Sequence, residues 1–435
     1  MARSAKRREK VAVMDAGFSE SEEVFRTWMH EPFLEHMADQ RYRERGAYTL
    51  GAFLVMRLVD RYVVEAGYNH PEALAYQENS TLEYVLKLDQ DDPEVGHLME
   101  LIRVSNQVRM GGKRKLLWAP LLAYAYWLEQ ELRLKEALDV VETAMRMDDG
   151  TASEKVVAAF LQQARILRLM GYFDLARESY KDARERAEAM GDTHGVLLSR
   201  IGDAIVLRQK GNLPASERAL REVLKDAERL GDRDAQARAH HDLGGAILLM
   251  HRTTEAVEHL FAAFELYEHW EDKFRALSDL GEALRRQGRY LAARNAFLAV
   301  VRRGAPRQVS SRSMISLMEV SALLKDPLEF ARWRSEIERI EEELPPEHRA
   351  DFYLQLGIGY SRFRNVRKAI PALQQALEIA KTWGLETYVA LTQRATLDLK
   401  KGSIAQPGEP DPAVATEPEA ELKRIEEALS ELAAA

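Results

Sequence analysis

The stretch LMGYFDLARESYKDARERAEAMGD, residues 169–192, decides the fold because its pattern recurs along the chain. A glycine precedes an aromatic residue, an alanine follows five residues after that glycine, and a second glycine closes the stretch. A catalytic constellation usually occurs once in a chain, whereas a structural unit is repeated. Seven residues share the position of this alanine at spacings of 37 to 40 residues: Ala137, Ala176, Ser216, Ala256, Ala293, Phe330 and Ala369. The stretch is therefore part of a repeat and not a unique site.

Each repeat is predicted to be a pair of packed helices. Apolar residues generally follow the shared position after four and seven residues, which places three side chains on one helix face. A small residue stands twelve residues earlier in six of the seven repeats, where a preceding helix would approach closely: Ala125, Ala164, Ala204, Gly244, Gly281 and Gly357. Glycines such as Gly191 and Gly231 are expected to end second helices, because glycine adopts the left-handed conformation without steric cost.

The sixth repeat departs from this pattern. Phe330 stands at the alanine position, Arg334 stands where an apolar residue is expected, and Met318 replaces the small residue. Pro345 and Pro346 follow. Because proline lacks a backbone N–H, we expect this pair to stop the second helix of the repeat and to bend the stack.

These small, aromatic and alanine positions resemble the tetratricopeptide repeat family, in a form whose period is about 40 residues. The resemblance covers residues 119 to 384. It implies an all-α fold, a right-handed α-solenoid of helical hairpins with an N-terminal helical cap region. It also implies a function in binding proteins or peptides, and it does not identify the partner.

The chain is predicted to comprise five segments. Residues 1–19 form a basic flexible tail, residues 20–118 an N-terminal helical region, and residues 119–400 the solenoid of about seven hairpins. Proline, glycine and acidic residues mark residues 401–418 as a flexible linker. Residues 419–435 are predicted to form an amphipathic helix, whose apolar stripe consists of Leu422, Ile425, Leu429 and Leu432.

Composition and motifs favour a cytoplasmic protein that is not an enzyme. The sequence holds 62 Lys and Arg residues against 70 Asp and Glu residues, a formal net charge of -8, and no cysteine. The lack of cysteine excludes disulfides and thiolate metal sites. We expect neither secretion nor membrane insertion, because the apolar runs are too short. No P-loop, dinucleotide-binding turn, nucleophile elbow or zinc-protease motif occurs, so we expect no catalytic residues and no cofactor.

Two groups of potential metal ligands have simpler interpretations. Asp89, Asp91 and Asp92 lack the glycine and the closing glutamate of a calcium loop, and Asp92 before Pro93 is expected to cap a helix. Histidines of one repeat are spread over both of its helices, so no metal site is expected among them: His240, His241, His251 and His259.

The candidate partner-binding residues come from the family resemblance. In that family the first helix of each hairpin lines a concave groove, and its inner positions are carried over by register. The resulting residues are Arg165, Arg168, Arg208, Arg238, His241, Arg275, Arg285, Arg286, Arg312 and Arg362. Apolar residues such as Ile201, Leu248, Ile315 and Leu354 are interleaved with them. Acids at the same positions are few, namely Glu129, Glu282, Glu319 and Asp351.

An arginine-rich groove predicts an acidic, amphipathic partner, because guanidinium groups form forked hydrogen bonds to carboxylates. The leading hypothesis is therefore a scaffold or adaptor that binds a protein or peptide. A peptide-responsive regulatory sensor and an RNA-binding helical array are the alternatives, and the net negative charge makes nucleic acid the weaker partner. The competing interpretation is that long arginines only solvate a helix face.

The C-terminal helix is acidic and has the charge expected of a ligand for this groove. It is expected to dock there as an internal placeholder, to cap the last hairpin, or to pair with its copy in a dimer.

Overall fold

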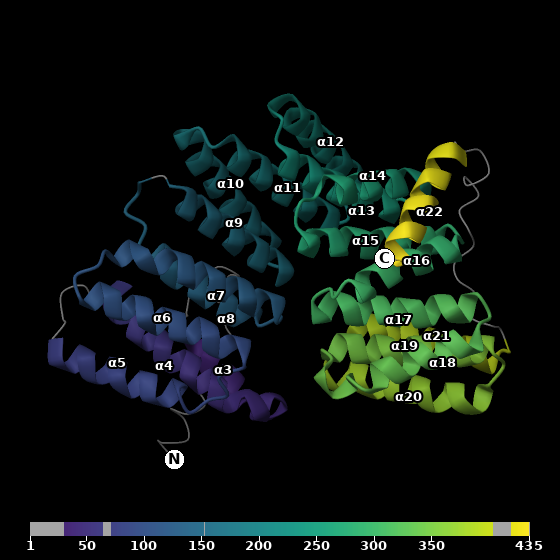
Figure 1. The fold of residues 1–435 in the computed structure, drawn as a ribbon, viewed down its shortest axis with the longest axis horizontal. Coiled ribbons are helices and arrows are strands. Elements are labelled where there is room, and N and C mark those ends of the chain that lie inside the picture. Colours follow the sequence, from purple (N-terminus) through teal and green to yellow (C-terminus); the bar gives the residue numbers. More distant parts are fainter. Residues whose placement is uncertain (1–29, 64–70, 152, 403–418, 435) are drawn as a thin grey trace, which may run out of the picture. The chain divides into compact units, whose positions relative to one another are not determined.

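The computed structural model describes residues 30–63, 71–151, 153–402 and 419–434. The described residues fold into α-helices and short 3₁₀ turns (Figure 1), which confirms the all-α prediction. The chain divides into two compact units, Met1–Lys210 and Gly211–Ala435, and each is described by itself. The predicted basic tail and residues 403–418 of the predicted linker lie outside the described residues.

The first unit begins with four helices, three of which pack around the fourth, α4. They are α3 (Glu31–Ala38), α4 (Gly46–Val63), α5 (Pro71–Val85) and α6 (Pro93–Arg109), with 3₁₀ turns η1 (Gln40–Arg45) and η2 (Arg114–Leu117). α4 contacts α3, α5 and α6 and buries an apolar face that includes Val55 and Leu58. As predicted, Asp92 caps α6, because its side chain accepts the Glu94 backbone N–H at 2.9 Å.

Two helical hairpins and one further helix complete the first unit. The hairpins are α7 (Trp118–Gln130) with α8 (Leu134–Met145) and α9 (Glu154–Leu169) with α10 (Phe173–Met190), and α11 (Thr193–Gln209) packs on α9 and α10. The N-terminal helices join this stack directly, since α6 packs on α7, and α3 and α4 touch α8. Gly191 ends α10 in the left-handed conformation at φ 74°, as predicted.

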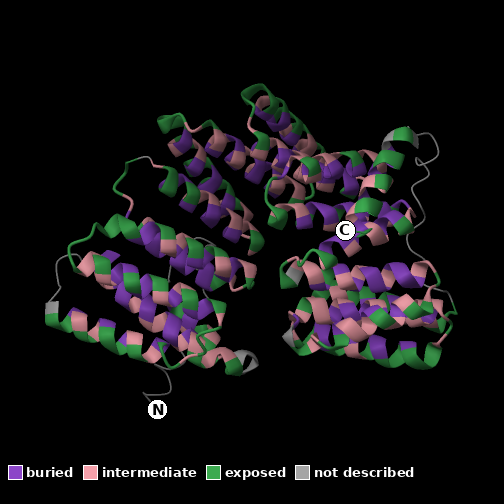
Figure 2. Ribbon diagram, in the orientation of Figure 1, coloured by how far each residue is buried: buried purple, intermediate pink, exposed green. Residues whose placement is uncertain are grey.

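The second unit consists of α12 (Leu213–Leu230), four packed hairpins and two further helices. The hairpins are α13 (Arg233–Leu249) with α14 (Thr253–Leu266), α15 (Trp270–Arg286) with α16 (Tyr290–Arg302), α17 (Arg307–Leu323) with α18 (Pro327–Glu338), and α19 (Pro346–Arg362) with α20 (Val366–Thr382). α21 (Glu386–Lys400) packs on α19 and α20, and α22 (Glu419–Ala434) lies against α16. In both units, buried residues follow the helix faces that meet (Figure 2).

The repeated positions lie where the two helices of a hairpin touch. Six residues at the shared position are fully buried: Ala137, Ala176, Ser216, Ala256, Ala293 and Ala369. The small residue twelve positions earlier faces a large one. A β-carbon at Gly281 would lie 2.7 Å from Phe297, and one at Gly357 would lie 2.7 Å from Leu373. These positions therefore pack as the sequence predicts.

The hairpin of α17 and α18 packs differently. Met318 is fully buried at the small-residue position, and Phe330 is 3% exposed because it reaches the next hairpin and lies against Gly359. The ring of Phe330 also contacts Tyr360 and Phe363, with centroids 5.5 and 5.2 Å away. α19 packs closely on α17 and touches α18 in few places. The unusual residues of the sixth repeat thus carry a different contact between hairpins.

The double proline does not end α18, and that prediction is wrong. α18 ends at Glu338, and a 3₁₀ turn, η3 (Glu341–Glu343), separates it from Pro345. Pro345 is the N-cap of α19 and Pro346 is its first residue, where the missing N–H removes no helix hydrogen bond. The two prolines therefore begin the next helix.

Candidate functional site

In the first unit the predicted arginines already contact side chains of the protein. Arg165 on α9 donates two hydrogen bonds to Glu129 on α7, at 2.5 and 2.7 Å, and Glu129 is only 5% exposed. Arg168 donates to the side-chain oxygen of Gln209 on α11 at 3.2 Å. Arg208 is half-buried near the end of α11. The contacts of Arg165 and Arg168 join neighbouring first helices.

In the second unit, Arg285 lies at the centre of a group of charges. It donates two hydrogen bonds to Glu282, both at 2.7 Å, and a third, at 3.0 Å, to Glu319 on α17. Arg286 donates to the same Glu282 at 2.8 Å. Arg362 on α19 interacts electrostatically with Glu319 and Arg285. We call these five residues the arginine cluster.

Four side chains of the arginine cluster are half-buried, and that of Arg286 is exposed. The cluster holds three guanidinium groups and two carboxylates, an excess of one positive charge. The side chains of Arg285 and Glu319 are 17% and 14% exposed. Burial raises the pKa of Glu319 although Arg285 opposes the shift. Burial also lowers the pKa of Arg362 from its usual range, and Arg285 adds to this effect. Both directions are those that burial produces in a charged group.

Arg238 and His241 on α13 form separate pairs. Arg238 donates to Asp234 at 2.7 Å and lies 3.9 Å from Asp272 on α15. Nε2 of His241 lies 2.9 Å from Oδ2 of Asp279. These aspartates were not predicted from the sequence, because only the inner positions of the first helices were considered there. The spacing of four residues between Asp234 and Arg238 was a signal for a helix ion pair.

The remaining predicted arginines, Arg275 and Arg312, are exposed on α15 and α17. Arg312 acts electrostatically on Asp351 of α19. The pKa of Asp351 is raised to about 6, chiefly because burial disfavours the carboxylate, while Gln355 and Arg312 oppose the shift. The structure therefore gathers three of the predicted arginines in the arginine cluster and leaves the other predicted residues in separate contacts.

Four of the apolar residues expected to line a groove belong to the core, so the expectation is wrong for them, whereas Leu161, expected at the same kind of position, is half-buried. Ile201, Leu248, Ile315 and Leu354 are 4%, 7%, 1% and 2% exposed. They lie in the packing between helices and cannot contact a partner. The arginine cluster is therefore a candidate site for acidic residues of the partner. The four buried residues cannot bind its apolar residues.

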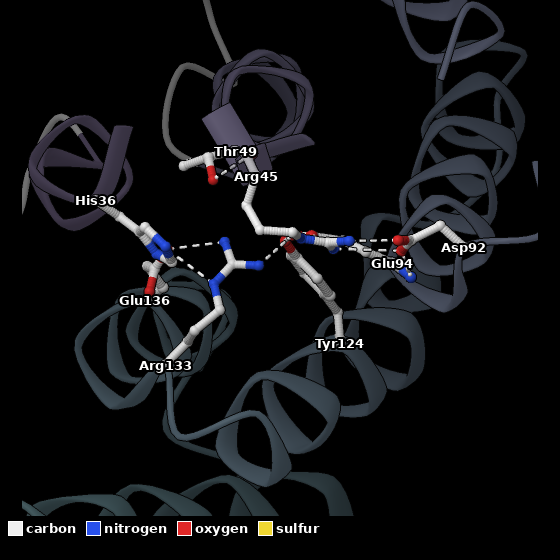
Figure 3. Close-up of polar contacts among 8 residues, drawn as sticks. All are labelled: His36, Arg45, Thr49, Asp92, Glu94, Tyr124, Arg133 and Glu136. Carbon is white, nitrogen blue, oxygen red and sulfur yellow. Dashed lines mark hydrogen bonds and ion pairs between the residues drawn. The ribbon is translucent and has the colours of Figure 1, made fainter. Parts of the chain in front are cut away.

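A buried polar group in the first unit was not predicted from the sequence (Figure 3). Glu94 on α6 is completely buried, and it accepts hydrogen bonds from Arg133 at 2.6 Å, Tyr124 at 2.8 Å and Arg45 at 2.7 Å. Arg133, whose side chain is 10% exposed, also donates to Glu136 on α8 at 2.8 Å. These side chains fill the space between η1, α6, α7 and α8. The group joins the N-terminal helices to the first hairpin.

His30, at the start of α3, is buried between two carboxylates. Its Nε2 lies 3.0 Å from Asp60 on α4, and its Nδ1 lies 2.5 Å from Asp139 on α8. Burial alone would lower the pKa of His30, but the hydrogen bonds with Asp139 and Asp60 outweigh burial and raise the pKa to about 9. The imidazole is therefore charged at neutral pH and holds three helices together.

The histidines of the α13–α14 hairpin do not converge on one point. His240 and His259 lie with their Nδ1 atoms 2.9 Å apart, whereas His241 contacts Asp279. Among the residues that the structure describes, no group of three or more His, Cys, Asp or Glu side chains is arranged to hold a metal ion. Within the same residues, no helix combines the length and the apolar character needed to cross a membrane.

Comparisons with known proteins find similar structures at low identity. No family model and no curated protein matches the sequence. A tetratricopeptide repeat protein from Parabacteroides merdae is 15% identical, with a TM-score of 0.38, over 63% of this chain and 98% of that chain. The apo form of the quorum sensor NprR from B. thuringiensis is 12% identical, with a TM-score of 0.47, over 82% and 97%. A Rap protein complexed with Competence and Sporulation Factor is 11% identical, with a TM-score of 0.45, over 76% and 98%.

Proposed function

We propose that this protein is a non-enzymatic scaffold or adaptor that binds an acidic segment of a partner protein at the arginine cluster. The observation that carries the proposal is that the cluster brings three guanidinium groups together with only two carboxylates, an excess of one positive charge. A carboxylate of the partner would compensate this charge where water is partly excluded. Charge-assisted hydrogen bonds to guanidinium groups are stronger in such surroundings.

The placement of the arginine cluster on α15, α17 and α19 suits a segment that crosses several first helices. The side chain of Arg286 is 39% exposed, whereas Arg285 is held by Glu282 and Glu319. We expect the partner's carboxylate to contact Arg286 and Arg362. Arg285 would then act as a positioning residue that fixes the two glutamates.

A peptide-responsive sensor is the second candidate, and the same placement favours it. A ligand that bridges side chains of α15 and α19 binds best at one spacing of these helices. Binding would therefore shift the protein toward that spacing. An adaptor needs no such change, so a ligand-dependent difference in hydrogen exchange of α17, which lies between the two, would distinguish the sensor.

The observed ion pairs disfavour an RNA-binding array. A nucleic-acid strand carries a phosphate at every nucleotide and is held by a groove of cations that follows its backbone. Arg165 is paired with Glu129, and Arg238 is paired with Asp234, so these positions do not offer an uncompensated row of charge. A protein segment needs only a few carboxylates at one place.

A peptide selection against the full chain tests the proposal. A random peptide library is selected for binding, and the affinities of the selected peptides are measured by fluorescence anisotropy. We expect peptides rich in Asp and Glu that bind the double variant Arg286→Glu and Arg362→Glu at least about tenfold more weakly, because the reversal replaces attraction by repulsion.

The matched control is Arg229→Glu, which reverses an arginine of α12 whose side chain is 72% exposed. This variant should bind the selected peptides like the parent. Selected peptides without an excess of acids, or equal affinities for the double variant and the control, would reject the arginine cluster as the binding site.

A further inference from the structure

The C-terminal helix α22 is docked on a surface formed by second helices. It packs against α16 (Figure 1), whereas the placeholder alternative would have placed it in the arginine-lined groove. Four residues of α22 are buried against this surface, with exposures of 6%, 1%, 0% and 6%: Leu422, Ile425, Leu429 and Ala433. They follow one another at intervals of three, four and four residues and share one helix face. Leu432, the predicted end of the stripe, is only half-buried.

Polar contacts fix the direction of α22 on this surface. Arg289, which precedes α16, donates to Glu426 at 2.8 Å. Arg302, the last residue of α16, donates to the backbone carbonyl of Ala433 near the end of α22. The two helices therefore run in the same direction. A cation at the end of α16 also stabilises the carbonyl end of the helix that docks there.

A second ion pair joins α22 to α14, because Arg424 donates to Glu265 at 2.7 Å. A hollow of about 420 Å³ remains beside α22, and its lining includes Arg289, Leu291 and Glu426. Leu291 is 60% exposed there. The surface of α16 thus extends beyond the part that α22 covers, and an incoming side chain has room next to the ion pair.

Residues 403–418 separate α22 from the described part of the repeat region, and the sequence predicts a flexible linker there. A helix of 16 residues is marginal in water without a surface to pack on. Docking and folding of α22 are therefore coupled, and the helix can leave without breaking any hairpin.

We propose that this face of α16 is a docking site for an amphipathic helix of a partner protein, and that α22 occupies it as an intramolecular competitor. The chemistry of α22 defines the partner. The partner helix has apolar residues at the intervals of the buried stripe, a carboxylate four residues after the first of them for Arg289, and its C-terminal carbonyls at Arg302. This site is separate from the arginine cluster and does not depend on it.

Competition from α22 weakens the partner's apparent affinity. If the predicted linker is flexible, α22 has an effective concentration at this site on the order of millimolar. If α22 itself binds this face with an intrinsic dissociation constant of about 10 µM, a partner helix would bind the full chain roughly 100-fold more weakly than a chain whose site is vacant. Release of α22 is therefore the event that the experiment must isolate.

The experiment uses the full chain and a fluorescent synthetic peptide with the sequence of residues 419–435. In the variant Leu429→Asp, the most buried residue of α22 becomes charged, so α22 should leave the site. The control is Ser430→Asp, which adds the same charge at the neighbouring exposed position. We expect the peptide to bind the Leu429→Asp chain at least about tenfold more tightly than the control chain or the parent.

A charge exchange between the chain and the peptide tests whether the peptide binds at α16. In the Leu429→Asp chain, the further substitution Arg289→Glu should weaken binding, and a peptide carrying Glu426→Arg should restore it. Equal binding to all chains, or no recovery with the exchanged peptide, would overturn the proposal. A parent chain that sediments as a dimer and becomes monomeric with Leu429→Asp would also overturn it, because the occupant would then be α22 of a second copy.

Discussion

Gly357 on α19 faces Leu373 on α20 so closely that a β-carbon at position 357 would lie 2.7 Å from Cγ of Leu373. Gly357→Leu should therefore lower the free energy of unfolding by about 1–3 kcal/mol through overpacking. The effect should exceed the gain of about 1 kcal/mol from replacing glycine inside a helix. The control is Gly96→Leu on α6, because a β-carbon there has no neighbour within 4 Å. Thermal melting followed by circular dichroism compares the two, and equal melting would show that the glycine position is not a helix contact.

The first unit should become less stable as the pH rises from 6.5 to about 9, because His30 loses its stabilising charge. Its pKa is raised to about 9 because Asp139 and Asp60 outweigh burial. The stabilisation is therefore complete below pH 6.5, the usual value, and is lost as the pH rises through 9. The shift corresponds to about 3 kcal/mol.

Urea unfolding at a series of pH values measures this effect. The slope between pH 6.5 and 9 should be much smaller in His30→Gln than in the parent. His269→Gln replaces an exposed histidine and should keep the slope of the parent. If His30→Gln and the parent have the same slope, the charge on His30 does not stabilise the fold.

Arg133→Met should destabilise the first unit by about 3–5 kcal/mol, because it leaves the buried carboxylate of Glu94 without its closest cation. Adding Glu94→Gln should recover part of the loss, since the remaining side chain is neutral. Arg103→Met is the control, as it breaks an exposed pair with Glu100 and should change stability by less than about 1 kcal/mol. Differential scanning calorimetry would test the series. A melting temperature for Arg133→Met close to that of the control would contradict a stabilising role of the buried group.

Phe330→Ala should destabilise the second unit although alanine is the residue that the repeat pattern predicts there. Phe330 fills the space against Gly359 and contacts Phe363, so its removal should cost about 3–5 kcal/mol. Leu328→Ala, on the same helix, removes a side chain that is 82% exposed and should have little effect. Chemical unfolding compares the two variants. If Phe330→Ala leaves the free energy of unfolding unchanged, the packing of α18 and α19 does not depend on this contact.

The helix pairs could be predicted from the sequence because they depend on short, regular spacings. Gly281 and Phe297 are only 16 positions apart, and the same spacing joins Gly357 to Leu373. Local periodicity and turn residues are sufficient to reveal such contacts. Whether Pro345 ends one helix or begins the next could not be decided from the sequence, because proline is found at both places.

The pairing of charges could not be predicted from composition at the inner positions. Glu129 and Arg165 are 36 residues apart, and Arg285 and Glu319 are 34 residues apart, so each pair depends on how neighbouring hairpins pack. Counting arginines alone overestimated the charge available to a partner. The docking surface of α22 was also hidden, because Arg289 and Glu426 are separated by 137 positions.

The docking of α22 on α16 changes how the end of the array can unfold. In a linear array each hairpin contacts its neighbours, so terminal hairpins can fray one at a time. The contact of Glu426 with Arg289 encloses α17 to α21 in a closed loop. If these helices unfold while α22 stays docked, residues 303–418 become one loop closed by the docked helix. Closing a loop about sevenfold longer than residues 403–418 alone has an additional entropic cost of roughly 1–2 kcal/mol. The C-terminal helix therefore acts as a reversible cross-link, which protects the enclosed helices from fraying for as long as it remains bound.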